Sequence, residues 1–406
     1  MPLYLERAGE VPLAVDITVS DIKNDEDFLG SLLPRTSIIG CLRLAGYSSI
    51  ETVAGDLPGF FDSPMPNLTS LDLQQAQESI ELFPSGQVPV PPVFQNVSKL
   101  ESLRLTQTPL YPPLFSIKSL RELKLIGYTS PFHFETFVRF LGSNLDLEFV
   151  VLDVQFLADS VETTPARKVA LARLQHLSIT CSKAIDSRRL LSCISLPRGV
   201  HLEVVFSQST QAPDFASFLP SPPTAIQELL APVTTIRARH SPWEVYLSGN
   251  TSVFSFSCPK PYWGFHSEFI SFPVTAVREF HTNSQPRILD GGFLSCLLGQ
   301  LPALEVLVLS MDPINHGVLS VLAQEPVLCP ALKTIAFFDC QMAQNQVDEL
   351  EAAVVKRRET TATRLYSVVI VTNNSKASLD LGLIHRLRTC VPHVEVRVDD
   401  KLPNLS

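Results

Sequence analysis

The amino-acid sequence predicts an α/β solenoid, in which short repeats stack side by side and each repeat adds one strand to a parallel sheet. Two observations lead to this prediction: one apolar motif recurs along nearly the whole chain, and helix signals follow several of its copies. A chain of 406 residues would otherwise suggest two or three domains of roughly 100 to 200 residues. Because a repeat array grows by adding units, we expect a single array over residues 1–406, with a possible loop break near 207–223.

The composition is that of a folded protein. Hydrophobic residues make up 45% of the chain and charged residues 18%, which excludes the charge-rich, apolar-poor pattern of disordered chains. The formal net charge of -9 comes without any block of like charge, so the sequence lacks the basic footprint of a protein that binds nucleic acid or an anionic membrane. We therefore expect neither as a partner.

The recurring motif is an apolar residue followed by apolar residues three and five positions later, as in Leu100, Leu103 and Leu105. Side chains of a strand alternate between its two faces, so the last two motif positions point into one core. The spacing is the L-x-x-L-x-L core of a leucine-rich repeat. Between residues 240 and 300 the frame is ambiguous, although 253–256 and 274–280 are expected as strands. Copies of the motif begin at Ile39, Leu68, Leu100, Leu120, Phe149, Leu174, Val233, Leu304, Leu332, Leu365 and Val391.

Helix signals between copies of the motif predict the segments that return the chain. A proline at the first helical position and a glycine at the end predict a helix over residues 131–142. A Thr-Pro pair opens a similar run over 165–174, and apolar residues at helical spacing predict helices over 291–298 and 347–355. Alternation of strand and helix gives a leucine-rich-repeat-like solenoid with a parallel sheet on the concave face and helices on the convex face.

No repeat is expected to be stable alone. Burying three large aliphatic side chains yields roughly 5 to 9 kcal/mol, whereas ordering about 27 residues at roughly 1.5 kcal/mol each costs far more. Stability must therefore come from stacked neighbours. The spacing between copies varies from about 20 to about 33 residues, which indicates a degenerate array of roughly a dozen units.

The cysteines and the first residues of the chain indicate an intracellular protein. No two of the eight cysteines stand in a C-x-x-C spacing, so we expect small buried hydrophobes with reduced thiols. Glu6 and Arg7 stand where a signal peptide needs its apolar stretch. These features predict a cytoplasmic or nuclear location.

The sequence carries no motif for catalysis. Phosphate-binding, dinucleotide-binding, nucleophile-elbow and zinc-protease motifs do not occur in it, so we expect no enzyme activity, no cofactor and no metal. His385 and His393 could form a metal pair, and Asp25, Glu26 and Asp27 could form a carboxylate cluster. Surface histidines and the acidic first turn of a helix explain the same residues more simply.

Two further clusters have both a structural and a functional interpretation. The basic residues Lys356–Arg358 are either the end of a helix or a nuclear-localisation patch, and the helix end is the simpler account. The aromatic residues between Trp243 and Phe265 are either a packed core patch or, if exposed, a binding hot spot.

The strand residues that alternate with the core positions form the surface on which repeat proteins bind their partners. In the first half of the chain these residues are polar (Ser70, Asp72, Gln74, Arg104, Glu122, Lys124 and Asp153), whereas in the last third they are apolar. A solvent-facing strand surface should be polar, so something must cover the apolar stretch. We predict a partner-binding site with Phe338 at its centre; the alternative is that loops or a terminal segment of the same chain cover it. The predicted partner-binding residues are Val306, Val308, Phe338, Val369 and Val371, and Ala336 belongs to the same apolar stretch.

The opening stretch LYLERAGEVPLAVDITV is similar to the segment that follows the F-box in F-box-like leucine-rich-repeat proteins of mushroom-forming fungi. MPNLTSLDL, VSKLESLRL and CPALKTIAF resemble the degenerate repeats of that family. The resemblance implies a protein-binding module that recognises substrates for a cullin-based ubiquitin ligase, with the cullin adaptor as a second partner if an F-box is supplied. The F-box itself would precede this opening and is missing from the sequence. The alternative is a structural or orphan repeat protein with no ubiquitin role.

Overall fold

A computed structural model shows a mixed α/β fold with a large, mostly parallel sheet and few helices, which confirms the predicted α/β class. The structure describes residues 10–18, 31–47, 60, 63–76, 97–108, 112–127, 133–153, 168–207, 233–240, 243–249, 253–258, 274–283, 291–310, 316–324, 328–338, 344–360, 364–372 and 381–398.

The chain divides into two compact units, Met1–Val204 and Val205–Ser406. The loop break expected near 207–223 begins just after this boundary, and residues 208–223 lie outside the described part of the chain. The single array over residues 1–406 stays a prediction.

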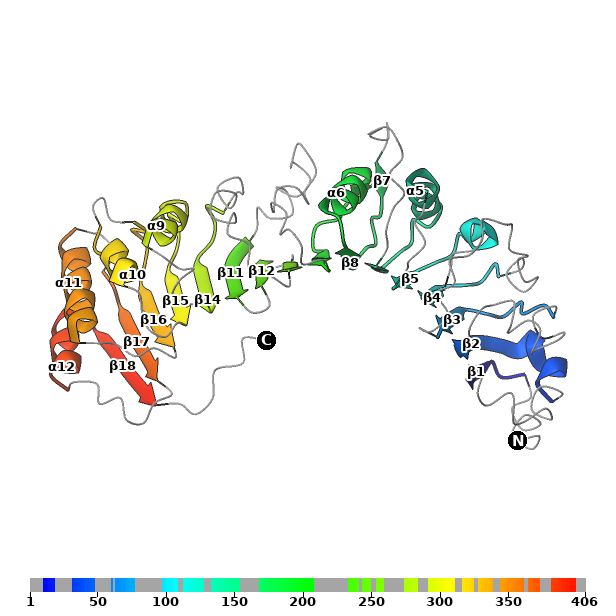
Figure 1. The fold of residues 1–406 in the computed structure, drawn as a ribbon, viewed down its shortest axis with the longest axis horizontal. Coiled ribbons are helices and arrows are strands. Elements are labelled where there is room, and N and C mark those ends of the chain that lie inside the picture. The colour runs from blue at the N-terminus through cyan, green and yellow to red at the C-terminus, as the bar shows by residue number, and fades with distance from the viewer. Residues whose placement is uncertain are drawn as a thin grey trace. The chain divides into compact units, whose positions relative to one another are not determined.

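The first unit holds parallel strands whose order in the sheet is their order in the chain (Figure 1). Each connection between neighbouring strands is longer than a dozen residues, as a parallel crossover requires. The strands are β1 (Leu13–Thr18), β2 (Ile39–Tyr47), β3 (Ser70–Gln75), β4 (Ser102–Thr106), β5 (Glu122–Ile126), β6 (Phe149–Asp153), β8 (His176–Cys181) and, at the boundary of the two units, β10 (His201–Phe206).

A repeated pair of backbone hydrogen bonds sets the register between neighbouring parallel strands. The carbonyl of Thr69, just before β3, accepts the N–H groups of Glu101 at 2.8 Å and Ser102 at 2.9 Å. The carbonyl of Glu101, just before β4, does the same for Arg121 and Glu122. Each strand start therefore positions the next one. The same double acceptance recurs at the carbonyls of Arg121, Glu148, Arg278, Glu305 and Lys333.

The second unit contains an antiparallel segment at one side of its sheet, and here the prediction of a uniformly parallel sheet is wrong. Strands β11 and β13 both pair antiparallel with β12, while β11 and all later strands are parallel. Only two residues join β11 to β12 and three join β12 to β13, which is too short for a parallel crossover. In sheet order the strands are β13 (Val253–Cys258), β12 (Trp243–Gly249), β11 (Val233–His240), β14 (Glu279–Asn283), β15 (Val306–Ser310), β16 (Thr334–Phe338), β17 (Ser367–Thr372) and β18 (His393–Val398).

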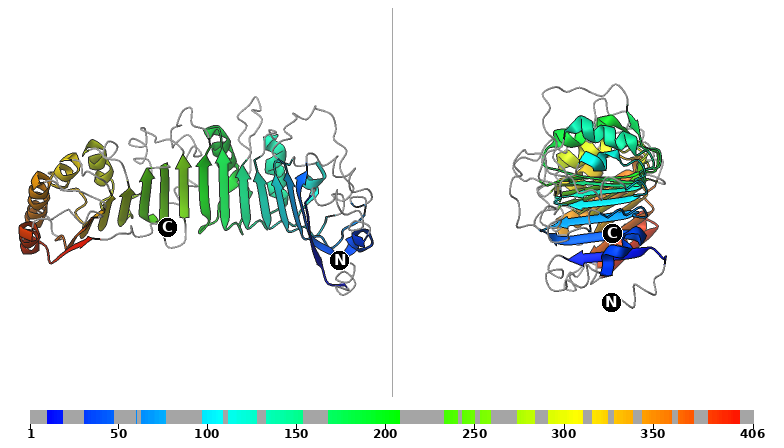
Figure 2. Two further views of the ribbon diagram at one scale, coloured as in Figure 1. Left: turned by 60° about the horizontal axis from the view of Figure 1, so that its bottom comes forward. Right: turned by 90° about the vertical axis from the view of Figure 1, so that its right-hand side faces the viewer.

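The helices of each unit lie on one side of its strands (Figure 2). In the second unit α9 packs on α10, α10 on α11, and α11 on α12. The first unit contains η1 (Leu33–Ile38), η3 (Pro112–Ser116), α5 (Phe134–Ser143), α6 (Ala184–Cys193) and a two-stranded sheet of β7 (Val169–Ala170) and β9 (Ile194–Ser195). The second contains α9 (Gly291–Gly299), α10 (His316–Leu322), α11 (Gln344–Thr360) and α12 (Leu381–Cys390).

Three of the four predicted helices are confirmed, as α5, α9 and α11. Helix α5 begins at Phe134 after His133, whereas the Ser-Pro signal stands at residues 130 and 131, outside the described part of the chain. The helix predicted over 165–174 is wrong, because residues 169–170 form β7 and a turn follows. Leu171 and Leu174 are buried because they lead into β8, and apolar residues three apart suit that role as well as a helix.

The motif residues form the core of each unit. All three positions are buried in the copies that begin at Leu68, Leu100, Leu120, Leu174, Leu304, Leu332 and Leu365. The copy predicted at Phe149 is wrong by two residues: Leu147, Val150 and Leu152 are buried, whereas Phe149 is 42% exposed. Phe149 is the first residue of β6, and its side chain lies on the face opposite the core.

Asn144 occupies a core position that the sequence analysis missed. A further buried residue precedes most motif copies by three positions, such as Val97 before Leu100, and Asn144 holds this place before Leu147. Its amide nitrogen donates to the carbonyls of Ile117 at 2.9 Å and Phe140 at 3.0 Å, and its oxygen accepts the N–H of Leu120 at 3.1 Å. A fully bonded buried amide thus ties one repeat to the backbone of the preceding one.

Leu103→Asp should unfold the repeats around β4 together with its own. Leu103 is fully buried, and an isolated carboxylate cannot be buried there without a partner. We expect a large fall in the midpoint of thermal unfolding and faster amide hydrogen exchange in β3 and β5. Ser98→Asp places the same charge on an exposed residue nearby and should leave both unchanged. An unchanged melt for Leu103→Asp would refute the stacked arrangement at this site.

Asn144→Ala should lower the free energy of unfolding by roughly 3 kcal/mol, because two carbonyls and one N–H would lose their partner in the core. Chemical denaturation of the full chain measures the change. Ser143→Ala is the matched control, since among the described residues the Ser143 hydroxyl donates to the Arg139 carbonyl of its own helix and to no other group. Equal effects of the two substitutions would mean that the amide network contributes nothing specific.

Candidate functional site

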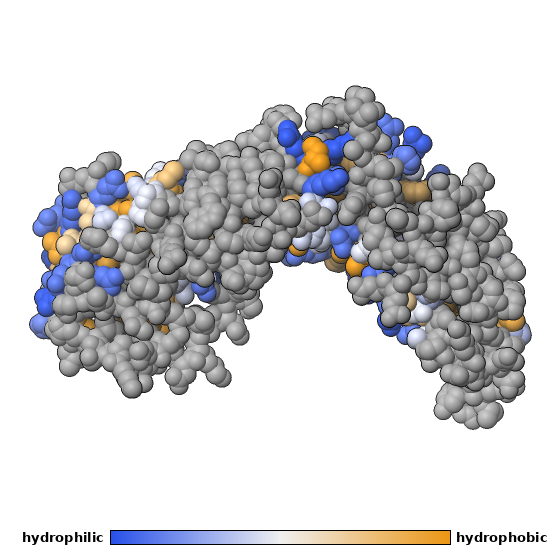
Figure 3. Space-filling model, in the orientation of Figure 1, coloured by the Kyte–Doolittle hydropathy of each residue, from blue (hydrophilic) through white to orange (hydrophobic). Residues whose placement is uncertain are grey.

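The candidate site is the face of β1 to β8 that lies opposite the core, here called the open face. Its residues alternate with the buried motif positions and stand in register from strand to strand. Figure 3 shows hydrophilic and hydrophobic residues next to each other in the part of the first unit that contains α6 and β8. The central row runs Asp16, Arg43, Asp72, Arg104, Lys124, Val151 and Ser178.

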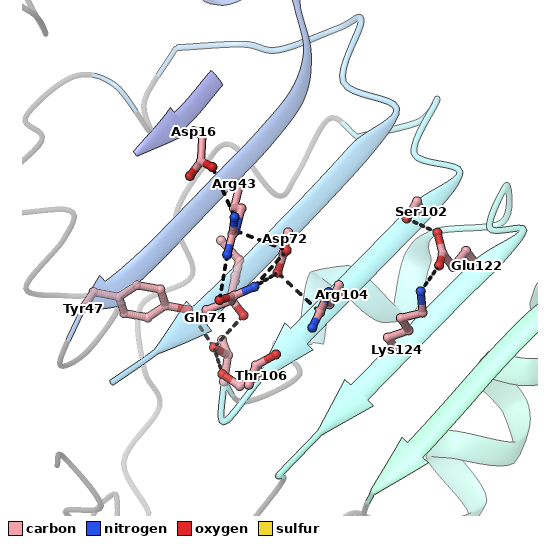
Figure 4. A network of polar contacts seen from close by, with 12 residues as sticks. Asp16, Arg43, Tyr47, Asp72, Gln74, Ser102, Arg104, Thr106, Glu122 and Lys124 are labelled. Carbon is pink, nitrogen blue, oxygen red and sulfur yellow. Dashed lines mark hydrogen bonds and ion pairs between the residues drawn. The ribbon is translucent and has the colours of Figure 1, made fainter. Parts of the chain in front are cut away.

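Opposite charges alternate along the first four members of this row and pair with one another (Figure 4). The Arg43 guanidinium lies 3.2 Å from the carboxylate of Asp16 and 3.6 Å from that of Asp72. Asp72 also lies 3.9 Å from Arg104 and accepts the Gln74 amide at 3.0 Å. Exposed pairs of this kind stabilise a fold by only about 0 to 1 kcal/mol each, so their main effect is to order the side chains of this face.

Two cations then follow each other without an acid between them. Arg104 on β4 and Lys124 on β5 are directly opposite in the register of the two strands. Lys124 forms an ion pair with Glu122 of its own strand, and the Ser102 hydroxyl donates to the same carboxylate at 2.7 Å. The hydrogen bond from Lys124 is the main reason that the pKa of Glu122 lies below its usual value. Like charges directly opposite each other on neighbouring strands are unfavourable.

An aromatic group lies beside these cations. Phe149 on β6 is opposite Glu122 on one side and His176 of β8 on the other. The ring of His176 meets that of His201 edge-on, with centroids 4.8 Å apart. Burial, and then the charge of His201, lower the pKa of His176, so this imidazole is neutral near pH 7. The open face therefore has an exposed aromatic side chain, Phe149, with ionisable groups on both sides of it.

The five residues predicted to bind a partner lie together on three adjacent strands of the second unit. Val308 of β15 is opposite Ala336 of β16, which is opposite Val369 of β17, and Phe338 is opposite Val371. Val308 is 8% exposed and Val371 is 4% exposed, while Val306, Phe338 and Val369 are half-buried. A partner therefore has access to only part of this set in the chain as it stands, and the predicted site stays a prediction.

The other candidates are separated or structural. His385 and His393 are both exposed on different elements, and His393 lies 3.6 Å from Glu395. Within the ranges that the structure describes, no group of three histidine, cysteine or acidic residues is placed to hold a metal. The acidic residues 25–27 lie outside those ranges.

The aromatic cluster is described only in part, because residues 259–265 and the side chains of Trp243 and Phe256 lie outside the described set. Phe254 is buried, and Arg237 lies over the Tyr246 ring at 6.0 Å. The cysteine prediction is only partly confirmed: Cys181, Cys193 and Cys329 are buried, whereas Cys41 and Cys296 are exposed.

Arg357 has a structural role that could not be recognised in the sequence, where it is one of three consecutive basic residues. Its guanidinium is buried and donates to the carbonyls of Leu328 at 2.8 Å and Cys329 at 2.7 Å, and to Leu322 at the end of α10 at 3.4 Å. Burial lowers the pKa of this group. A side chain in this position connects α11 to the preceding repeat and is not displayed as part of a basic patch.

A scan against protein-family models finds none that matches this chain, and a search of the curated proteins finds no similar sequence. Among the described residues, no helix has the length and apolar character needed to cross a membrane.

Phe338→Glu should distinguish a binding role of the apolar strand face in the second unit from a core role. Because the neighbouring Val371 is buried, we expect the charge to lower the free energy of unfolding, by roughly 2 kcal/mol. Denaturant titration measures this change, and Tyr366→Glu, at a residue 62% exposed in the same strand region, is the control. An unchanged stability, together with loss of a bound protein, would instead support the predicted partner site.

Proposed function

We propose that the protein is a leucine-rich-repeat-like solenoid that binds another protein through its sheet, with the sheet on the concave face and helices on the convex face. The observation that carries this proposal is the in-register open face of the first unit, where each strand from β1 to β6 contributes a half-exposed or exposed side chain to the central row. Each repeat supplies the same core positions and a variable outward residue. This separation of framework from surface is what repeat proteins use for recognition.

The dimensions and charges of the open face favour a protein partner. Seven strands spaced about 4.8 Å apart present a surface roughly 29 Å wide, which matches a protein interface better than a small-molecule pocket. Acids and bases alternate along it, and the chain carries a net charge of -9, so nothing favours a polyanion such as nucleic acid. No catalytic motif accompanies the face in the sequence.

The more specific proposal is that this module recognises substrates for a cullin-based ubiquitin ligase in the cytoplasm or nucleus. Its support is the similarity of the opening stretch and of the repeats to F-box-like leucine-rich-repeat proteins. The second candidate, a repeat protein with no ubiquitin role, has equal support from the repeats alone.

Cross-linking in the cells of origin tests these proposals. The full chain carries a tag, a lysine-reactive cross-linker is added before lysis, and cross-linked peptides are identified by mass spectrometry against a tag-only control. Recovery of a cullin and its adaptor supports the ligase proposal. A different protein in equal amount, with cross-links to Lys124 or Lys99, supports protein binding and removes the ligase role. If no protein exceeds the tag-only control, both proposals are wrong.

A further inference from the structure

Arg104 and Lys124 have different carboxylates in ion-pair contact, although the charge of Glu122 also acts on Arg104. The only carboxylate that Arg104 contacts among the described residues is Asp72 at 3.9 Å, and Asp72 also serves Arg43 and Gln74. The carboxylate beside Lys124 is Glu122, which lies on the same strand. The two cations are nonetheless direct neighbours across β4 and β5, with side chains 44% and 34% exposed. A carboxylate placed over both would relieve their repulsion and gain two charge-assisted hydrogen bonds.

Phe149 supplies an apolar contact at a fixed offset from this pair. Lys124 is opposite Val151, and Phe149 stands two residues before Val151 on β6, so Phe149 lies diagonal to Lys124 across neighbouring strands. Diagonal neighbours in a sheet lie about 7 to 8 Å apart. In an extended peptide, side chains two residues apart are separated by about 7 Å and point the same way. The spacing therefore fits one extended segment over both groups.

We propose that the open face binds an acidic segment of a partner protein, in which an Asp or Glu contacts Arg104 and Lys124 and an apolar residue two positions away packs on Phe149. The inference rests on the proposed protein-binding function and adds the chemistry of the partner. A large exposed aromatic beside a charge pair has the composition of an interface hot spot. The alternating charges from Asp16 to Asp72 continue the same row and leave Arg104 as its last member before Lys124.

A peptide array probed with the full chain tests the proposal. All peptides carry Glu and Leu two positions apart, in varied flanking sequence, and matched sets carry Gln for Glu, Ser for Leu, or phosphoserine for Glu. We expect the Glu–Leu set to bind, and the Gln and Ser sets to bind roughly tenfold more weakly or worse. Equal binding of the Glu and Gln sets would overturn the proposal, and exclusive binding of the phosphoserine set would replace the carboxylate by a phosphate.

Variants of the chain separate this site from the rest of the surface. The double variant Arg104→Gln, Lys124→Gln and the single variant Phe149→Ser should each weaken binding to the best peptide by about tenfold or more. The controls are Arg121→Gln, which removes an exposed cation beside the start of β5, and Tyr366→Ser, which removes an exposed aromatic in the second unit. Circular dichroism establishes that each variant is folded. Binding that is unchanged in both site variants contradicts the proposal.

A partner identified by the cross-linking experiment distinguishes failure of the acidic-segment proposal from failure of the protein-binding proposal. If it binds the wild type and the double variant equally, the acidic-segment proposal fails while protein binding stands. If the chain captures no protein and no peptide set is enriched, the proposed function fails as well.

Discussion

The fold depends on the paired backbone hydrogen bonds at the strand starts, where one carbonyl accepts two N–H groups of the next repeat. This contact fixes the register, and a shift of one residue would send every core side chain to the opposite face. Because the register repeats, equivalent positions of successive repeats form rows. One set of rows becomes the core, as with Leu71, Leu103 and Leu123, and the other set becomes the surface.

The same constraint produces the candidate site. Asp72, Arg104 and Lys124 come from separate repeats and meet only because their strands are aligned. No local motif could place them together, since about twenty or more residues separate each from the next. The chemistry of this surface therefore depends on which residues stand at equivalent positions of neighbouring strands. A substitution at one such position changes the surroundings of the side chains on both adjacent strands. Asn144 makes a similar connection in the core, because its side-chain amide forms hydrogen bonds with the backbone of Ile117 and Leu120 in the preceding repeat.

Much of the core could be predicted from the sequence, because leucines at a fixed spacing, such as Leu100, Leu103 and Leu105, determine which residues of a strand face the core. Phe149 could not be placed, since an aromatic residue at a strand start fits a core frame two residues away from the true one. The antiparallel strands were missed because the motif fades there, although the two-residue connection at 241–242 was a usable signal. Pairing of Arg104 with Lys124 follows from the register, while the exposure of each side chain needs the structure.

The antiparallel strands show how the sheet of such a chain can become wider with few additional residues. Strands β12 and β13 together occupy residues 243–258, whereas a single step from β15 to β16 takes the chain from Val306 to Thr334. Two strands widen a sheet by about 10 Å in either case. Gain or loss of such a hairpin alters the breadth of the sheet and keeps the parallel register of the strands beside it. A sheet of this kind can therefore widen by a short insertion as well as by the addition of a whole strand and its long crossover.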